Sequence, residues 1–317
     1  MFKRFRTSKL FCALLTLLIV LPPELLAIKF SALRGSYGAL LFFGVPFSLG
    51  FVSVLLYEEL AGPNAVGGMS VALLATLLSG SFLLIAGWEG VICLLIVLII
   101  AVPFTLLGAG FGILILGLRR SRTLAACLVF LMPMLAPQES HWHMGPEQFT
   151  VQTSIEIAAP PEKVWPHVVS FPAIGEAPNS IFFRSGVAYP METTISAQGL
   201  GAKRTCIFTT GAAEEVVDVW DKPHCLHFTV LSQPPLMREK SWVPDLQTEH
   251  IKSEYVRSRE GQFDLIALPN GHTLLRGTSW YDLKYRPTAY WHLWTDAMVH
   301  RIHMRVLEHI KAEVEKD

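Results

Sequence analysis

The chain has 317 residues, of which 51% are hydrophobic and only 16% charged, and its formal net charge is zero. Ordinary soluble domains carry about 25% charged residues. The composition therefore excludes a disordered chain, a nucleic-acid-binding chain and a single soluble domain, while the length suffices for about two domains.

The zero net charge conceals two halves of opposite charge. Residues 1–137 contain nine Lys and Arg against four Asp and Glu, whereas residues 138–317 contain seventeen against twenty-two. The first aspartate of the chain is Asp218. We interpret the first half as a transmembrane region, residues 138–148 as a linker, and residues 149–317 as a domain in water.

Five apolar segments of the first half are candidate membrane spans, since crossing a bilayer takes about 20 mostly apolar residues. The candidates are Leu10–Ile28, Gly38–Tyr57, Met69–Trp88, Val91–Leu118 and the shortest, Thr123–Ala136. A cleaved signal peptide is the alternative for the first of them. The absence of a clear small-x-small site after Pro22-Pro23-Glu24 favours retention. The simplest role for this region is an anchor.

Basic residues beside the spans predict the orientation. With the N-terminus inside, seven basic residues are cytoplasmic and two, Lys29 and Arg34, are outside. Five spans then place the second half outside the cytoplasm, and we expect an integral protein of a bacterial inner membrane. If the fifth segment only lies on the surface, the second half is cytoplasmic instead.

Alternating and helical patterns define the elements of the second half. Phe149–Ile157 alternates apolar and polar residues as a half-exposed strand does. A helix starting at Pro160-Pro161 and ending by Pro172 follows it. Asn270-Gly271 predicts a hairpin between the last two strands, and a final helix extends from Pro287 to about Glu315. Six strands are expected between the helices: Ser180–Tyr189, Lys203–Thr210, Glu214–Trp220, Leu226–Leu231, Gly261–Leu268 and His272–Tyr285.

The final helix carries an unbroken i, i+4 apolar series from Tyr290 to Val314. Such a series drifts about 40° per step around the helix, which suits a long helix crossing a twisted sheet. Asp296, His300 and His303 lie near His292 and roughly opposite the start of this series. We expect them to form a solvated polar face, with a metal site as the less favoured alternative.

This order of elements resembles the START-like superfamily, also called the polyketide cyclase/dehydratase-like or SRPBCC family. The resemblance covers about residues 149–316 and implies an α+β helix-grip fold with a curved antiparallel sheet and a long C-terminal helix. Six segments carry it: Ile157–Trp165, Gly199–Arg204, Glu215–Trp220, Gly261–Phe263, Gly271–Leu274 and Tyr290–Trp294. Members bind lipids, hormones or polyketides, some are cyclases, and they share no catalytic motif.

The resemblance also implies a cavity between the sheet and the last helix, with a solid core as the alternative. Strand alternation and the helix series supply the candidate lining: Arg204, Phe208, Phe228, Phe263, Tyr281, Tyr290, Trp294 and Met298. Arg204 faces inward if Cys206 and Phe208 do, and could then bind an acidic group of a ligand. The opposite register, with Thr205, Ile207 and Thr209 inward, leaves Arg204 in water.

Three further features are less informative. Gly199-Leu-Gly201 lacks the third glycine of a nucleotide-binding loop and precedes a strand, so we reject nucleotide binding there. Cys206 and Cys225 are expected to be free thiols. The long segment Ser232–Arg259 is interpreted either as a lid over a pocket mouth or the bilayer, or as a loop packed outside the sheet.

The favoured function is a membrane-anchored binding domain for a hydrophobic, lipid-like or polyketide-like small molecule. The expected partners are that molecule and the membrane, with no nucleic acid, no cofactor and no metal. A cyclase, dehydratase or isomerase using Arg204 or Tyr281 is the second hypothesis. An interaction module with a filled core is the third.

Overall fold

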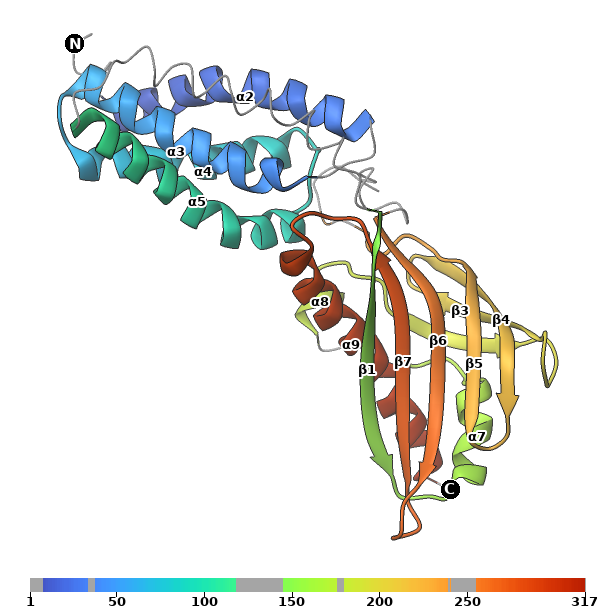
Figure 1. Ribbon diagram of the computed structural model, residues 1–317. Helices are drawn as coiled ribbons and strands as arrows, with labels where there is room; N and C mark the ends of the chain where they lie inside the picture. Colours follow the sequence, from blue (N-terminus) through green and yellow to red (C-terminus); the bar gives the residue numbers. More distant parts are fainter. Residues whose placement is uncertain are drawn as a thin grey trace. The chain divides into compact units, whose positions relative to one another are not determined.

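The computed structural model describes residues 8–33, 38–117, 145–175, 180–238, 240 and 255–316. The chain divides into two compact units (Figure 1). The first comprises residues 1–144 with 240–246, and the second comprises residues 145–239 with 247–317.

The first unit is helical, with α2 (Lys9–Leu33), α3 (Ala39–Ala61), α4 (Ala65–Ile85) and α5 (Val91–Gly117). Three described stretches are long and apolar enough to cross a membrane: Leu41–Ala61, Ala65–Ile85 and Val91–Gly117. The apolar stretch Lys9–Pro23 of α2 is shorter. The fifth predicted span, Thr123–Ala136, lies outside the described residues.

Small residues let α3 and α5 approach closely. A Cβ atom on Gly50 of α3 would lie 1.9 Å from the carbonyl oxygen of Thr105, and one on Gly108 of α5 would lie 2.0 Å from that of Phe47. Close backbone approach at glycine is the usual way apolar helices associate in lipid. Thr105 also hydrogen-bonds to Thr76 of α4 at 2.8 Å, so three helices meet at this level.

The second unit is an antiparallel seven-stranded sheet in the order β1-β7-β6-β5-β4-β3-β2, accompanied by three helices. The order of elements along the chain, with one strand, two short helices, six strands and a long helix, is the expected helix-grip arrangement. The bounds are β1 (Glu147–Ile157), α7 (Pro161–Val169), α8 (Ile181–Arg184), β2 (Pro190–Ile195), β3 (Lys203–Phe208), β4 (Gly211–Asp221), β5 (Cys225–Ser232), β6 (Val256–Ala267), β7 (Thr273–Leu283) and α9 (Thr288–Val314).

One predicted strand is wrong. Residues 180–189 contain the short helix α8 and a turn, and the strand at this place in the fold is β2. Gly186 has a φ of +112°, and a Cβ there would lie 2.0 Å from the carbonyl oxygen of Arg238, so the chain turns where the strand was expected. β2 begins with Pro190, which an edge strand tolerates at its first position.

The sheet curves around α9, because this helix reaches both of its edges (Figure 1). His300 of α9 hydrogen-bonds to Thr153 of β1 at 2.8 Å. Arg305 donates from Nε to the carbonyl oxygen of Pro190 in β2 at 3.1 Å. β1 and β2 are the two edge strands, so one face of the sheet, with every second side chain of the strands between them, is turned toward the helix.

The C-terminal half of α9 closes one end of the unit with a fully buried core. Leu307 and Ile310 have no exposed surface, and neither do Ile157 of β1 and Leu275 of β7. They belong to one apolar cluster, to which α7 contributes Val164 and Trp165. Burying these large aliphatic groups supplies much of the stability of the unit.

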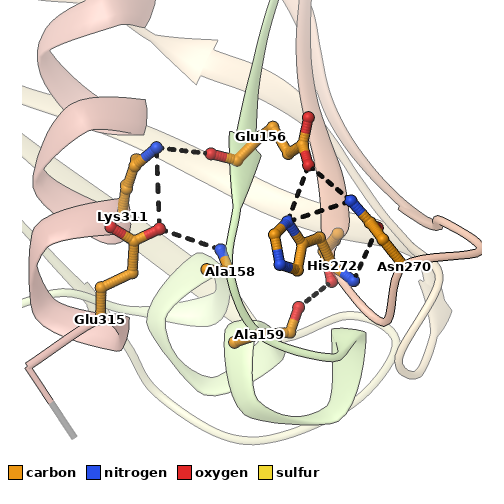
Figure 2. Close-up of polar contacts among 8 residues, drawn as sticks. Glu156, Ala158, Ala159, Asn270, His272, Lys311 and Glu315 are labelled. Carbon is orange, nitrogen blue, oxygen red and sulfur yellow. Dashed lines mark hydrogen bonds and ion pairs between the residues drawn. The ribbon is translucent and has the colours of Figure 1, made fainter.

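Polar contacts tie the C-terminus of α9 to the same end of the sheet (Figure 2). Lys311 donates to the carbonyl oxygen of Glu156 at 2.8 Å, and the Glu315 carboxylate accepts the backbone N–H of Ala158 at 2.9 Å. His272, at the β6–β7 hairpin, bonds to the Glu156 carboxylate at 2.7 Å. Hydrogen bonds to that carboxylate lower the pKa of Glu156.

Replacing Leu307 by Ala should cost about 2–5 kcal/mol, because the truncation leaves a cavity in a fully buried site. Unfolding of the full chain, followed by tryptophan fluorescence in detergent, would measure the change. Leu293→Ala on the same helix is the control, since Leu293 is 66% exposed. Equal effects of the two variants would contradict the packing described here.

Candidate functional site

The N-terminal and central turns of α9 present polar side chains to the sheet. His292, Asp296 and His303 form hydrogen bonds with side chains of β7. The His292 and Asp296 side chains are still 30% and 33% exposed, and His300 is exposed, so the predicted solvated face is wrong for His303 alone. Within the described residues no three His, Cys, Asp or Glu side chains are grouped so that they could hold a metal ion.

Tyr281 of β7 lies at the centre of the first polar cluster. Its hydroxyl donates to Asp296 at 2.6 Å and lies 3.2 Å from Nδ1 of His292. The His292 ring stacks on Phe149 of β1 with centroids 4.2 Å apart. Burial, assisted by the Asp296 carboxylate, raises the pKa of Tyr281. The phenol is therefore a neutral hydrogen-bond donor.

His303 is the centre of a second polar cluster, farther along α9. Its Nε2 lies 2.8 Å from the hydroxyl of Ser279, and its Nδ1 lies 3.1 Å from the hydroxyl of Thr153. The same Thr153 hydroxyl lies 2.8 Å from Nδ1 of His300. Burial, with a smaller contribution from His300, lowers the pKa of His303 to about 4. At neutral pH the ring therefore donates through one nitrogen and accepts through the other.

A buried ion pair forms the third cluster, on β3 and β4. The guanidinium of Arg204 donates to the carboxylate of Glu215, and the two residues are 3% and 6% exposed. The Arg204 Nε also donates to the carbonyl oxygen of Val169 at 3.4 Å. Burial raises the pKa of Glu215, an effect that Arg204 opposes. Of the two registers considered from sequence, β3 has the one with Arg204 and Cys206 buried.

Aromatic rings adjoin this ion pair. The Arg204 guanidinium carbon lies 4.6 Å from the ring centroid of Phe228 and 5.9 Å from that of Phe263. A Cβ on Gly261 of β6 would come within 2.4 Å of the Phe228 ring. The ring therefore covers the backbone of β6 at a position where only glycine leaves room. Gly261 is the cross-strand neighbour of Ser279, so the ion pair, the rings and the His303 cluster lie in a row.

The remaining predicted lining residues keep part of their surface exposed. Tyr290, Trp294 and Met298 of α9 and Phe208 of β3 are half-buried. The rings of Tyr290 and Trp294 meet edge to face with centroids 6.3 Å apart. The structure thus brings Arg204 together with the two phenylalanine rings, and Tyr290 together with Trp294, while Tyr281 is paired with Asp296. Whether these residues bind a ligand stays a prediction.

The two cysteines of this unit, Cys206 and Cys225, are free as expected. Burial raises the pKa of each thiol to about 11. Neither is therefore a nucleophile at neutral pH.

The unit is similar in shape to several solved structures. The Zhui aromatase/cyclase from Streptomyces sp. R1128 is 14% identical, with a TM-score of 0.35, covering 54% of this chain and 95% of its own. Truncated norcoclaurine synthase from Thalictrum flavum is 10% identical, with a TM-score of 0.36, covering 55% and 98%. An uncharacterised protein from Bacillus thuringiensis is 14% identical, with a TM-score of 0.35, covering 53% and 99%.

No protein-family model matches the chain, and no curated protein matches it. The strand order and the long terminal helix give the second unit a helix-grip fold, which follows an N-terminal region of apolar helices.

Replacing His303 by Gln should flatten the acid sensitivity of the domain. The folded pKa of His303 is about 4, against about 6.5 in an unfolded chain, so the unfolded state takes up the proton first. This contribution to stability is complete above about pH 6.5 and is lost as the pH falls toward 4. Melting temperatures of the full chain between pH 7 and 4 measure it.

The matched control is His272→Gln, because His272 lies on the hairpin at the other end of β7. It removes a partly exposed histidine outside the His303 cluster, so its pH profile should stay steeper than that of His303→Gln. A His303→Gln profile as steep as that of the unaltered protein would contradict the neutral state of His303.

Proposed function

We propose that the helix-grip domain binds a neutral, apolar small molecule with aromatic or lipid-like character, and that the N-terminal helices anchor it to a membrane. The observation that carries this proposal is the row of polar side chains between α9 and the inner face of the sheet. Polar groups are expensive to bury, and a domain core of this size can be built without them. Ligand sites, by contrast, combine apolar walls with a few fixed polar groups.

The distribution of exposure along the inner face supports the same proposal. Near the C-terminus of α9, inward side chains such as Leu275 and Leu307 are fully buried. Toward its N-terminus, Val230, Phe263 and Met298 keep accessible surface although they lie on inward strand positions or on the predicted inward helix series. A ligand on this part of the inner face would cover that surface.

The charge balance favours a neutral ligand. A buried guanidinium requires an acidic partner, and Glu215 supplies it within the chain. The pair is formally neutral, so a ligand need not bring a carboxylate. The sequence-based expectation that Arg204 anchors an acidic ligand stays a prediction. It differs from the present proposal, which is that the ligand is neutral.

Replacing Phe263 by Ala should weaken the binding of 1-aminoanthracene, a neutral aromatic probe, by about tenfold or more. The ring borders both the ion pair and the His303 cluster, and removing it deletes apolar contact area. Binding is measured by fluorescence to the full chain in nanodiscs, with empty nanodiscs subtracted. Ile266→Ala, a neighbouring change at an exposed position, should leave binding unchanged.

Two outcomes separate the alternatives. If Arg204→Leu weakens an anionic probe such as anilinonaphthalene sulfonate but spares 1-aminoanthracene, Arg204 anchors acids and the neutral-ligand proposal is wrong. If neither probe binds beyond empty nanodiscs, the core is filled and the domain is an interaction module.

The proposal also specifies on which side of the membrane the helix-grip domain lies. Nothing in the described helices fixes a side, but the basic residues of the sequence favour a cytoplasmic N-terminus. With five spans the domain lies outside the cytoplasm, in keeping with a bacterial inner-membrane protein that takes its ligand from that side.

A reporter that is active only in the cytoplasm, fused after Asp317, should therefore be silent. A reporter fused after Glu59, between the second and third predicted spans, should be active and serves as the control. Activity at both positions would mean an even number of spans and a cytoplasmic domain.

A further inference from the structure

We infer that Ser279, His303, Thr153 and His300 form a proton relay that connects a ligand on the inner face of the sheet with water. The inference rests on the proposed binding function and adds chemistry to it. It assigns acid–base roles to four residues, none of which sequence reasoning placed in a reaction.

The relay is a continuous series of hydrogen bonds that begins at Ser279 of β7, on the inner face of the sheet, and ends at the exposed His300 of α9. Ser279 to His303 measures 2.8 Å, His303 to Thr153 3.1 Å, and Thr153 to His300 2.8 Å. Three elements supply the groups: β7 and β1, which are paired strands, and α9. His303 and His300 are both positioned by one hydroxyl, so no link needs a rearrangement of the chain.

The two ends of the relay are suited to exchange a proton. The outer end, His300, is exposed. The inner end, Ser279, is half-buried and lies across from Gly261, where no side chain separates it from the Phe228 ring. A neutral apolar molecule held against Phe228 and Phe263 would therefore lie beside the Ser279 hydroxyl.

Each of the four side chains in the relay can both give and accept a proton, so the transfer balances. When a bound molecule loses a proton, Ser279 Oγ accepts it while the Ser279 proton moves to Nε2 of His303. The Nδ1 proton of His303 moves to Thr153, the Thr153 proton moves to Nδ1 of His300, and the Nε2 proton of His300 leaves to water. Each residue gains one proton for each that it gives up, and both imidazole rings change tautomer. Reversing all steps protonates the ligand and restores the tautomers.

A neutral imidazole is what such a relay requires, since a doubly protonated ring cannot accept from Ser279. His303 meets this requirement because burial disfavours its charged form. The reaction class that fits is proton transfer to or from a neutral apolar substrate, as in an isomerisation or a dehydration.

The test uses 5-nitrobenzisoxazole, a neutral aromatic probe. Loss of its ring C–H proton to a base breaks the N–O bond and releases a coloured nitrophenolate. The full chain in nanodiscs should accelerate this ring opening above empty nanodiscs. Thr153→Val should reduce the rate at saturating probe at least tenfold, because it replaces the central hydroxyl by a methyl group of similar size. Thr153→Ser should stay within about twofold of the unaltered protein.

Ser279→Ala provides a second interruption, at the inner end, and should lower the rate to the same extent as Thr153→Val. Probe binding, followed by quenching of tryptophan fluorescence, should change less than twofold in all three variants. His272→Gln controls for general loss of a histidine, because His272 lies on the distant hairpin.

The outcomes distinguish the relay from the binding function. If the probe does not bind the unaltered protein, the proposed binding function fails. If it binds but opens no faster than in empty nanodiscs, or if Thr153→Val and Thr153→Ser react equally fast, the relay is wrong and the binding function stands. A purely structural role of Thr153 would change melting temperature without separating these two rates.

Discussion

The side of α9 that faces the sheet changes from polar to apolar along the helix, and the second unit depends on this change. Leu307 and Ile310 pack into a fully buried cluster near the C-terminus, whereas His292, Asp296 and His303 hydrogen-bond to Tyr281 and Ser279 farther back. The apolar half supplies stability, because aliphatic burial has no desolvation cost. The polar part ties the helix to β7 through directional hydrogen bonds.

The ion pair of Arg204 and Glu215 extends the polar row across the sheet. Buried pairs of this kind contribute little to stability compared with apolar residues of similar volume. Their retention next to Phe228 and Phe263 is better explained by a requirement for a fixed, formally neutral dipole among apolar walls. The ion pair shares this formal neutrality with His303, whose lowered pKa keeps its ring uncharged at neutral pH.

Much of this architecture could be predicted from sequence, because period-two alternation in β1 and the Asn270-Gly271 turn are local signals. The inward polar side chains of α9 could not be predicted. The i, i+4 apolar series indicated which side of the helix faces the sheet, and it is buried in the core only toward the C-terminus, at Val306, Ile310 and Val314. The pairing of Glu215 with Arg204 could have been predicted from the sequence. The two-residue turn at 209–210 pairs Phe208 with Gly211, and four residues farther along each strand this register pairs Arg204 with Glu215. The strand expected over residues 180–189 failed because the turn at Gly186 depends on a partner distant in sequence, Arg238.

The central claim is that the inner face beside the first half of α9 is a ligand site and not a filled core. Native mass spectrometry of the full chain, released from detergent without added ligand, tests it most directly. The account predicts a small apolar molecule of defined mass that remains bound to the unaltered protein. It also predicts that this molecule is lost from Gly261→Ala, where the added methyl group displaces the Phe228 ring. A chain that carries no such molecule and binds none of a panel of neutral aromatic and lipid-like compounds would contradict the account.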